Sequence, residues 1–301
     1  MLKTFSHATR AAAFALAASA ALSLAPAALA QQPPQNQQQQ QEQQRAQKKK
    51  LQASSNFAQY AGRDASNRLI AGGATRGNLT DEAGQLSQKG QDAYEAGKYD
   101  EAIAAFRRVT EMKPDNAKAF YHLGVSYETA GRYKEAVEAY KKAAGLSESK
   151  ETLALRAISY YNMGNAYAAD NKPKQAAEAY KQVIALAPDQ AVAHYNLGLA
   201  YAAAEQPQDA VAEFKQAIKL KADYAEAFFN LGITYGNLGQ YGDAAAAFKR
   251  AAEIKPDYAD AHYNLGLAYL ALDDQTSALA EIKTLETLNK TLAARLKSLS
   301  Q

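Results

Sequence analysis

The chain has 301 residues, of which 48% are hydrophobic and 22% charged, and its lack of cysteine excludes disulfides, thiolate zinc sites and cysteine catalysis. The formal net charge of +3 is unevenly distributed, since residues 31–80 hold seven Lys/Arg against two Asp/Glu and residues 81–301 hold 25 against 29. The longer part is therefore mildly acidic, which argues against a nucleic-acid groove because such a groove needs a basic stripe.

Residues 1–30 have the three parts of a secretory signal peptide. Lys3 and Arg10 make the start positive, residues 11–24 are apolar and rich in Ala, and residues 28–30 fit the rule of two small residues before the cleavage site. We expect cleavage after Ala30 and export, with the bacterial periplasm as the destination. An uncleaved membrane anchor is the alternative, but the apolar stretch is short for a span.

Residues 31–50 form a Gln-rich segment of low complexity, with almost no apolar side chain, so we expect it to be disordered. A flexible spacer is its simplest role, and a coiled coil is disfavoured because no apolar heptad is present. Residues 51–79 are expected to be a tether with room for a short helix. Contact with a membrane surface would be weak and would involve three consecutive lysines, Lys48, Lys49 and Lys50.

From residue 80 onward the chain repeats itself every 34 residues. The dipeptide Leu-Gly recurs at residues 197–198, 231–232 and 265–266, and Tyr201, Tyr235 and Tyr269 keep the same step. A fixed period of this length is typical of stacked repeat proteins.

Each unit is predicted to be two amphipathic helices joined by a tight turn. Leu231, Tyr235 and Leu238 share one face of a first helix by their spacing. Gly239 is expected to end that helix, and Pro256 to stop the second one. Thr80 is the expected cap of the first helix of the whole array.

This pattern resembles the tetratricopeptide repeat, with a large residue, Leu-Gly, Tyr, Ala, an aromatic residue and Pro at set offsets. The resemblance covers residues 83–292 in six repeats. They run over residues 83–116, 117–150, 157–190, 191–224, 225–258 and 259–292. The resemblance implies an all-α, right-handed superhelical solenoid of helix-turn-helix units.

Three departures from the family pattern are informative. Residues 151–156 are extra and lack Gly and Pro, so they are expected to lengthen the first helix of the third repeat by more than a turn. Ile282 replaces the aromatic residue in the sixth repeat. Residues 291–301 are expected to form a capping helix, with Leu292, Leu296 and Leu299 on one face.

The resemblance also implies where a ligand would bind. In this family the first helix of each repeat lines a concave face, with positions two, five, nine, twelve and thirteen pointing inward. Positions five and nine would form a ladder of aromatic rings beside an apolar strip, which suits a peptide. The candidate ligand-binding residues are Tyr121, Val125, Tyr161, Asn165, Tyr195, Leu199, Phe229, Ile233, Tyr263 and Leu267. The alternative is that the rings simply pack against the next repeat.

Polar residues at neighbouring positions qualify this site. Position five has no Lys or Arg, so a clamp for a C-terminal carboxylate is not expected. Glu226 and Asp260 at position two favour a partner with a basic flank. A recurring Asn at position six is interpreted as a hydrogen-bonding spacer between helices, at Asn162, Asn196, Asn230 and Asn264.

No sequence motif for catalysis or metal binding is present. The chain lacks GxxxxGK[ST], GxSxG and HExxH, and His122, His194 and His262 fall in separate repeats. We therefore expect no enzyme activity, no cofactor and no metal. The leading interpretation is a protein–protein interaction scaffold of the cell envelope that binds a peptide or helix in its concave groove.

Two alternatives stay open. The array is a structural or self-assembling component that acts through its convex face, or it is an accessory subunit of an envelope secretion or polysaccharide export complex. The sequence does not set the partner or the oligomeric state.

Overall fold

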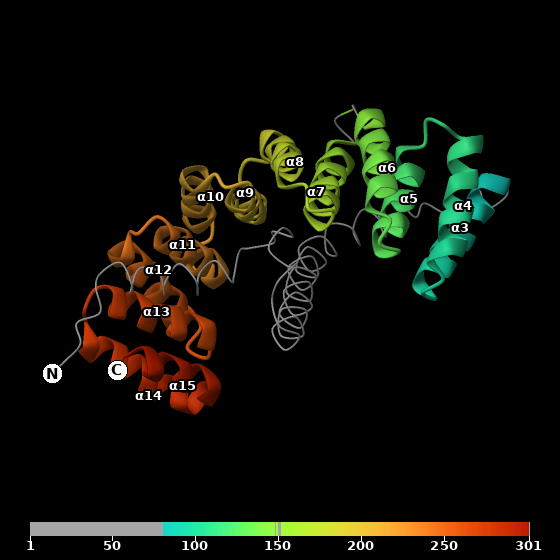
Figure 1. Ribbon diagram of the computed structural model, residues 1–301. Coiled ribbons are helices and arrows are strands. Elements are labelled where there is room, and N and C mark those ends of the chain that lie inside the picture. The colour runs from blue at the N-terminus through green and yellow to red at the C-terminus, as the bar shows by residue number, and fades with distance from the viewer. Residues whose placement is uncertain (1–80, 148, 150–151, 301) are drawn as a thin grey trace, which may run out of the picture. The chain divides into compact units, whose positions relative to one another are not determined.

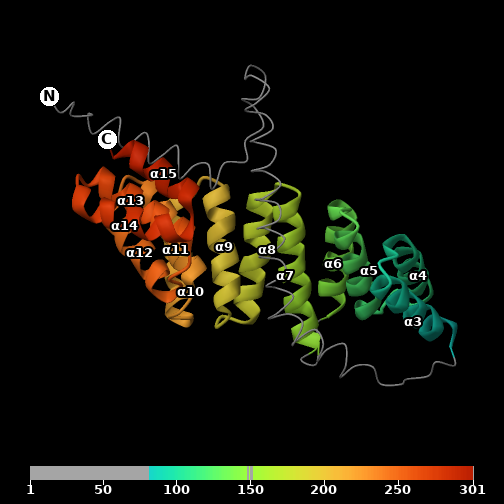
Figure 2. The same ribbon diagram turned by 90° about the horizontal axis from the view of Figure 1, so that it is seen from below.

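The computed structural model describes residues 81–147, 149 and 152–300, and within them it contains thirteen α-helices and no strand (Figures 1 and 2). The expected signal peptide, Gln-rich segment, basic lysines and tether lie outside the described residues. The described residues fall into two compact units, one ending at Pro188 and the other beginning at Asp189.

The 81–188 unit consists of six helices in three consecutive pairs. These are α3 (Glu82–Glu95), α4 (Tyr99–Met112), α5 (Ala117–Thr129), α6 (Tyr133–Leu146), α7 (Leu153–Ala169) and α8 (Pro173–Leu186). Each helix packs against the next one in the chain. The cap of α3 is Asp81, whose Oδ1 accepts from the Gly84 amide at 2.7 Å. The expected cap Thr80 lies outside the described residues.

The 189–300 unit consists of three further pairs and a terminal helix. These are α9 (Ala191–Ala203), α10 (Pro207–Leu220), α11 (Ala225–Asn237), α12 (Tyr241–Ile254), α13 (Ala259–Ala271), α14 (Gln275–Leu288) and α15 (Lys290–Leu299). The expected all-α architecture of helix-turn-helix units with a C-terminal capping helix is confirmed. None of the described helices combines the length and apolarity that crossing a bilayer requires.

The turn inside each pair needs one residue with left-handed backbone. Gly239, the residue expected to end α11, has φ of 74°. Asn171, Glu205 and Asp273 take the same role in other repeats, with φ of 57°, 60° and 61°. The turn geometry is therefore a property of the repeat and is adopted even where glycine is missing.

The two helices of a repeat approach closely at the glycine of the Leu-Gly dipeptide. A Cβ atom built at Gly124, Gly164, Gly198 or Gly232 would lie 2.6–2.7 Å from a ring carbon on the second helix. Real Cβ contacts essentially never occur at that distance. Since the rings belong to the aromatic residue sixteen positions later, glycine and ring form one packing unit.

The sixth repeat builds this contact differently. The side chain nearest to Gly266 is Leu296 of α15, and both Leu296 and Ile282 are buried. Because Ile282 is shorter than an aromatic residue, the terminal helix fills the space that a ring fills elsewhere. The predicted apolar face of α15 is right for Leu296 and for half-buried Leu292. It is wrong for Leu299, which is 45% exposed.

The extra residues before the third repeat lengthen its first helix as expected. Helix α7 has 17 residues, whereas α5, α9, α11 and α13 have 13. The difference is just over one helical turn. Helix α7 begins at Leu153, so within the 151–156 insertion Thr152 is its N-cap residue and Glu151 lies outside the described residues.

Candidate functional site

The aromatic rings at position five are mostly buried. Tyr121, Tyr161, Tyr195 and Tyr263 are 6–9% exposed, and Phe229 is half-buried. Four of these rings pack on the aromatic residue of the second helix of their own repeat. The centroid distances are 5.9 Å for Tyr121–Tyr140, Tyr161–Tyr180 and Tyr195–Phe214 and 5.7 Å for Phe229–Phe248. The four tyrosine rings therefore expose little of their surface to a ligand, and Phe229 exposes more.

In the 189–300 unit a second aromatic ring covers position five. Tyr224 lies 4.9 Å from Tyr195, and Tyr258 lies 4.9 Å from Phe229, both as ring centroids. Lys221 and Lys255 place their ammonium groups over Tyr224 and Tyr258, at 4.8 and 5.3 Å. Since Tyr224 and Tyr258 are the N-cap residues of α11 and α13, these ring pairs fix the end of one repeat, where the next repeat begins, against its own first helix.

The recurring Asn at position six links adjacent repeats. The side-chain amide of Asn162 donates to the Tyr121 hydroxyl at 3.3 Å, and that of Asn230 donates to the Tyr195 hydroxyl at 3.0 Å. The interpretation of these residues as hydrogen-bonding spacers is confirmed for both. Asn264 instead donates to the Asp260 carbonyl at 2.7 Å.

Replacing Asn230 with alanine is expected to lower the free energy of unfolding by about 1 kcal/mol, the usual net contribution of such a hydrogen bond. Asn237→Ala on the exposed end of α11 is the matched control and should change it by less. Urea denaturation followed by circular dichroism measures both variants. Equal effects would contradict a role for Asn230 as a spacer.

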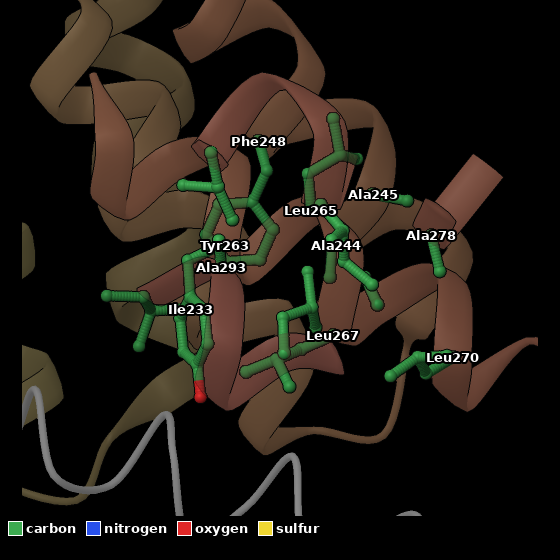
Figure 3. Close-up of a cluster of buried hydrophobic side chains, with 14 residues drawn as sticks. Ile233, Ala244, Ala245, Phe248, Tyr263, Leu265, Leu267, Leu270, Ala278 and Ala293 are labelled. Carbon is green, nitrogen blue, oxygen red and sulfur yellow. The ribbon is translucent and has the colours of Figure 1, made fainter. Parts of the chain in front are cut away.

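Position nine differs between the repeats. Val125, Asn165 and Leu199 are half-buried, whereas Ile233 and Leu267 are 1% and 3% exposed. Figure 3 shows Ile233 and Leu267 within a cluster of buried side chains. Ile233 and Leu267 are therefore core residues, which a ligand on the surface does not reach. The accessible candidates are Val125, Asn165, Leu199 and Phe229.

Two tyrosine hydroxyls of the second helices reach polar side chains of the first helices. Tyr180 donates to Oδ1 of Asn165 at 2.7 Å, and Tyr140 donates to Oε2 of Glu128 at 2.6 Å. Glu128 and the tyrosines were not among the residues predicted from the sequence. The sequence signal that could have identified Glu128 is its place at position twelve of its repeat, one of the positions that the family resemblance places on the ligand-binding face.

Burial raises the pKa of Glu128 to about 7 from its ordinary value of 4.5, and the hydrogen bond from Tyr140 only partly opposes this. Because the folded pKa is the higher one, the stability contributed by this group is fully present below about pH 4.5. It is lost as pH rises through about 7.

Glu128→Gln keeps an acceptor for Tyr140 but does not ionise. We expect the variant to be more stable than the wild type at about pH 8, by about 2 kcal/mol, and equally stable near pH 4. Urea denaturation of both proteins at each pH measures this difference. Burial also lowers the pKa of His122 to about 4, but both proteins contain His122, so its titration cancels. A difference that does not change with pH would contradict the expectation.

The histidines have structural contacts. His122 stacks on Phe106 with centroids 5.3 Å apart. Nδ1 of His194 lies 2.7 Å from Glu213, and Nδ1 of His262 lies 2.6 Å from Glu281. Nowhere in the part of the chain that the structure describes do three His, Asp or Glu side chains gather in a way that suits a metal ion.

Family models described as tetratricopeptide repeat match residues 87–151, 161–225, 213–246 and 259–291, and one described as TPR repeat matches residues 237–273. No curated protein sequence matches the chain. The crystal structure of MamA is similar at 27% identity and a TM-score of 0.53, covering 59% of this chain and 93% of that one.

Two other solved structures extend the likeness. YrrB, described as a TPR protein with an unusual peptide-binding site, is 25% identical with a TM-score of 0.54, covering 65% of this chain and 100% of that one. A tetratricopeptide repeat protein from Parabacteroides merdae shares the fold at 17% identity and a TM-score of 0.57, covering 72% of this chain and 85% of that one.

Proposed function

Because the chain belongs to the tetratricopeptide repeat family, whose fold is a non-catalytic interaction scaffold, we propose that it binds a polypeptide segment of a partner protein along its first helices. The observation that carries this proposal is that side chains at position nine are accessible in each unit. Val125 and Asn165 of the 81–188 unit and Leu199 of the 189–300 unit are half-buried, whereas the tyrosines at position five of the same helices are buried. In the 81–188 unit these side chains provide apolar contact and one amide for a backbone hydrogen bond.

Charge favours a partner with basic residues. Residues 189–301 hold ten Lys/Arg against fourteen Asp/Glu, whereas residues 81–188 are balanced at fifteen each. Glu226 is exposed at position two of its repeat, and Asp260 is half-buried at the same position of the next one. Rim charges of this kind steer a partner and select its orientation more than they add affinity.

Photo-crosslinking in cells tests the proposal. A photoreactive residue at Leu199 should yield one dominant adduct, and the same residue at exposed Ala212 on α10 should yield none. Leu199 is a better site than Tyr195, because Tyr195 is only 7% exposed and a larger residue there would disturb the packing. Equal adducts at both positions, or none at either, would contradict binding at position nine of this repeat.

The proposal places the protein in the bacterial envelope, with cleavage after Ala30 and a role in secretion or polysaccharide export. Three features of residues 1–30 support this placement: the positive start, the apolar Ala-rich stretch and the small residues before the cleavage site. Sequencing the N-terminus of the protein from a periplasmic fraction is the direct test. A start at Gln31 is expected, and recovery of the intact chain from the cytoplasm would contradict it.

A self-assembling role is the second candidate, and one observation favours it. Large apolar side chains are exposed near the C-terminus, at Leu272, Leu279, Leu288 and Leu299. Light scattering separates the two candidates. A monomer at all concentrations argues against self-assembly, and an oligomer that Leu279→Gln disperses would support it.

A further inference from the structure

The 81–188 unit contains a half-buried acidic side chain that forms no ion pair with any basic residue the structure describes. Glu128 lies at position twelve of its repeat, and Tyr140 is its hydrogen-bond donor. None of the ion pairs formed by the described residues includes Glu128. Lys118 at position two of the same helix is ten residues away, about 15 Å along the axis, and Arg132 pairs with Glu135.

The side chains around Tyr140, the hydrogen-bond donor to Glu128, are aromatic and carry hydroxyl oxygens. The ring of Tyr121 lies 5.9 Å from that of Tyr140, and the Tyr94 hydroxyl lies 3.1 Å from the hydroxyl of Thr129. Phenol oxygens are acceptors and ring faces attract cations, so the surroundings of the Glu128–Tyr140 pair suit a positive group. A carboxylate or phosphate ligand would instead meet the charge of Glu128.

An unpaired carboxylate that is partly removed from water destabilises the folded state. The raised pKa of Glu128 is one sign of this cost. A cation brought by a ligand would form a charge-assisted hydrogen bond and recover the lost stabilisation on binding. The site is thus better satisfied when occupied than when empty.

We propose that Glu128 anchors a lysine or arginine side chain of the polypeptide that binds the 81–188 unit, with Tyr140 holding the carboxylate in place. This inference rests on the proposed function and adds the chemistry of one ligand residue. It agrees with the preference for basic residues argued above from Glu226 and Asp260.

The test uses the full chain and a positional-scanning library of short peptides with acetylated and amidated ends. The wild type should select Lys or Arg over Leu at one peptide position by at least about tenfold. Glu128→Gln should lose that selection, and Glu128→Lys should select Asp or Glu at the same position. Glu138→Gln, an exposed change on α6, is the matched control and should keep the wild-type preference.

The other outcomes show whether the proposed function, the role of Glu128 or the need for a partner is wrong. If no peptide binds either the wild type or the variant with Lys48, Lys49 and Lys50 changed to Gln, both the proposed function and this inference fail. If peptides bind and Glu128→Gln keeps the wild-type selection, only this inference fails. If binding appears only after Lys48, Lys49 and Lys50 are changed to Gln, the occupant is the chain's own basic segment and no partner is needed. Because Glu128→Gln is expected to stabilise the fold at neutral pH, lost selection would not reflect unfolding.

Discussion

Replacing Leu296 with alanine is expected to lower the free energy of unfolding of the 189–300 unit by about 2–5 kcal/mol, the usual range for a buried leucine. Leu296 is 0% exposed and packs on Gly266, in the place that an aromatic ring takes in the preceding repeats. Ile282 is already too short to fill this space, so the cavity left by alanine has no neighbour ready to close it.

Leu299→Ala on the same helix is the control for this prediction, because Leu299 is 45% exposed. Its effect should stay within about 0.5 kcal/mol. Repeat arrays need not unfold in one step, so hydrogen exchange should accompany urea denaturation. Protection should fall first in α13, α14 and α15. Equal effects of the two substitutions would show that α15 does not complete the core of the sixth repeat.

Gly232→Ala is expected to destabilise the protein by about 1–3 kcal/mol through overpacking. The added Cβ would lie 2.7 Å from a ring carbon of Phe248, and Phe248 is 0% exposed, so its ring has no free space to move into. The larger side chain of Gly232→Leu should cost at least as much.

Gly242→Ala provides a control with the opposite sign. Gly242 is an exposed helical residue of α12, and a Cβ there meets no atom within 4 Å. Alanine should therefore stabilise the protein by about 0.4–1 kcal/mol. Thermal and urea unfolding of both variants tests the contrast. The stability of Gly242→Ala should lie above that of the wild type, and the stability of Gly232→Ala should lie below it. Two variants shifted in the same direction would contradict the proposed packing of Gly232 on Phe248.

The 34-residue period was enough to predict the helices and their pairing. Leu231, Tyr235 and Leu238 mark a helical face, and Gly239 marks the turn, because both signals depend on residues close together in the chain. The close approach of the helices at Gly232 was also predictable, since its aromatic partner keeps a constant distance in the sequence.

The candidate ligand-binding residues were only partly predictable. Val125 and Ile233 occupy the same repeat position, yet Val125 is half-buried and Ile233 is 1% exposed. Ile233 lies in one cluster with Tyr263 and Leu267 of the following repeat (Figure 3). The period assigns a position to a face, but the size of the neighbours in the next repeat decides how much of a side chain a ligand can reach.

The 34-residue spacing of large, small and aromatic residues in the sequence therefore determined that this chain is a tetratricopeptide repeat array with a terminal capping helix. Only the tertiary structure decided that Leu296 substitutes for a missing ring and that Glu128 is half-buried beside Tyr140 with no ion-pair partner among the described residues. The physical reason is that helix formation follows local periodicity, whereas burial and the pKa of a carboxyl depend on atoms brought together from different helices.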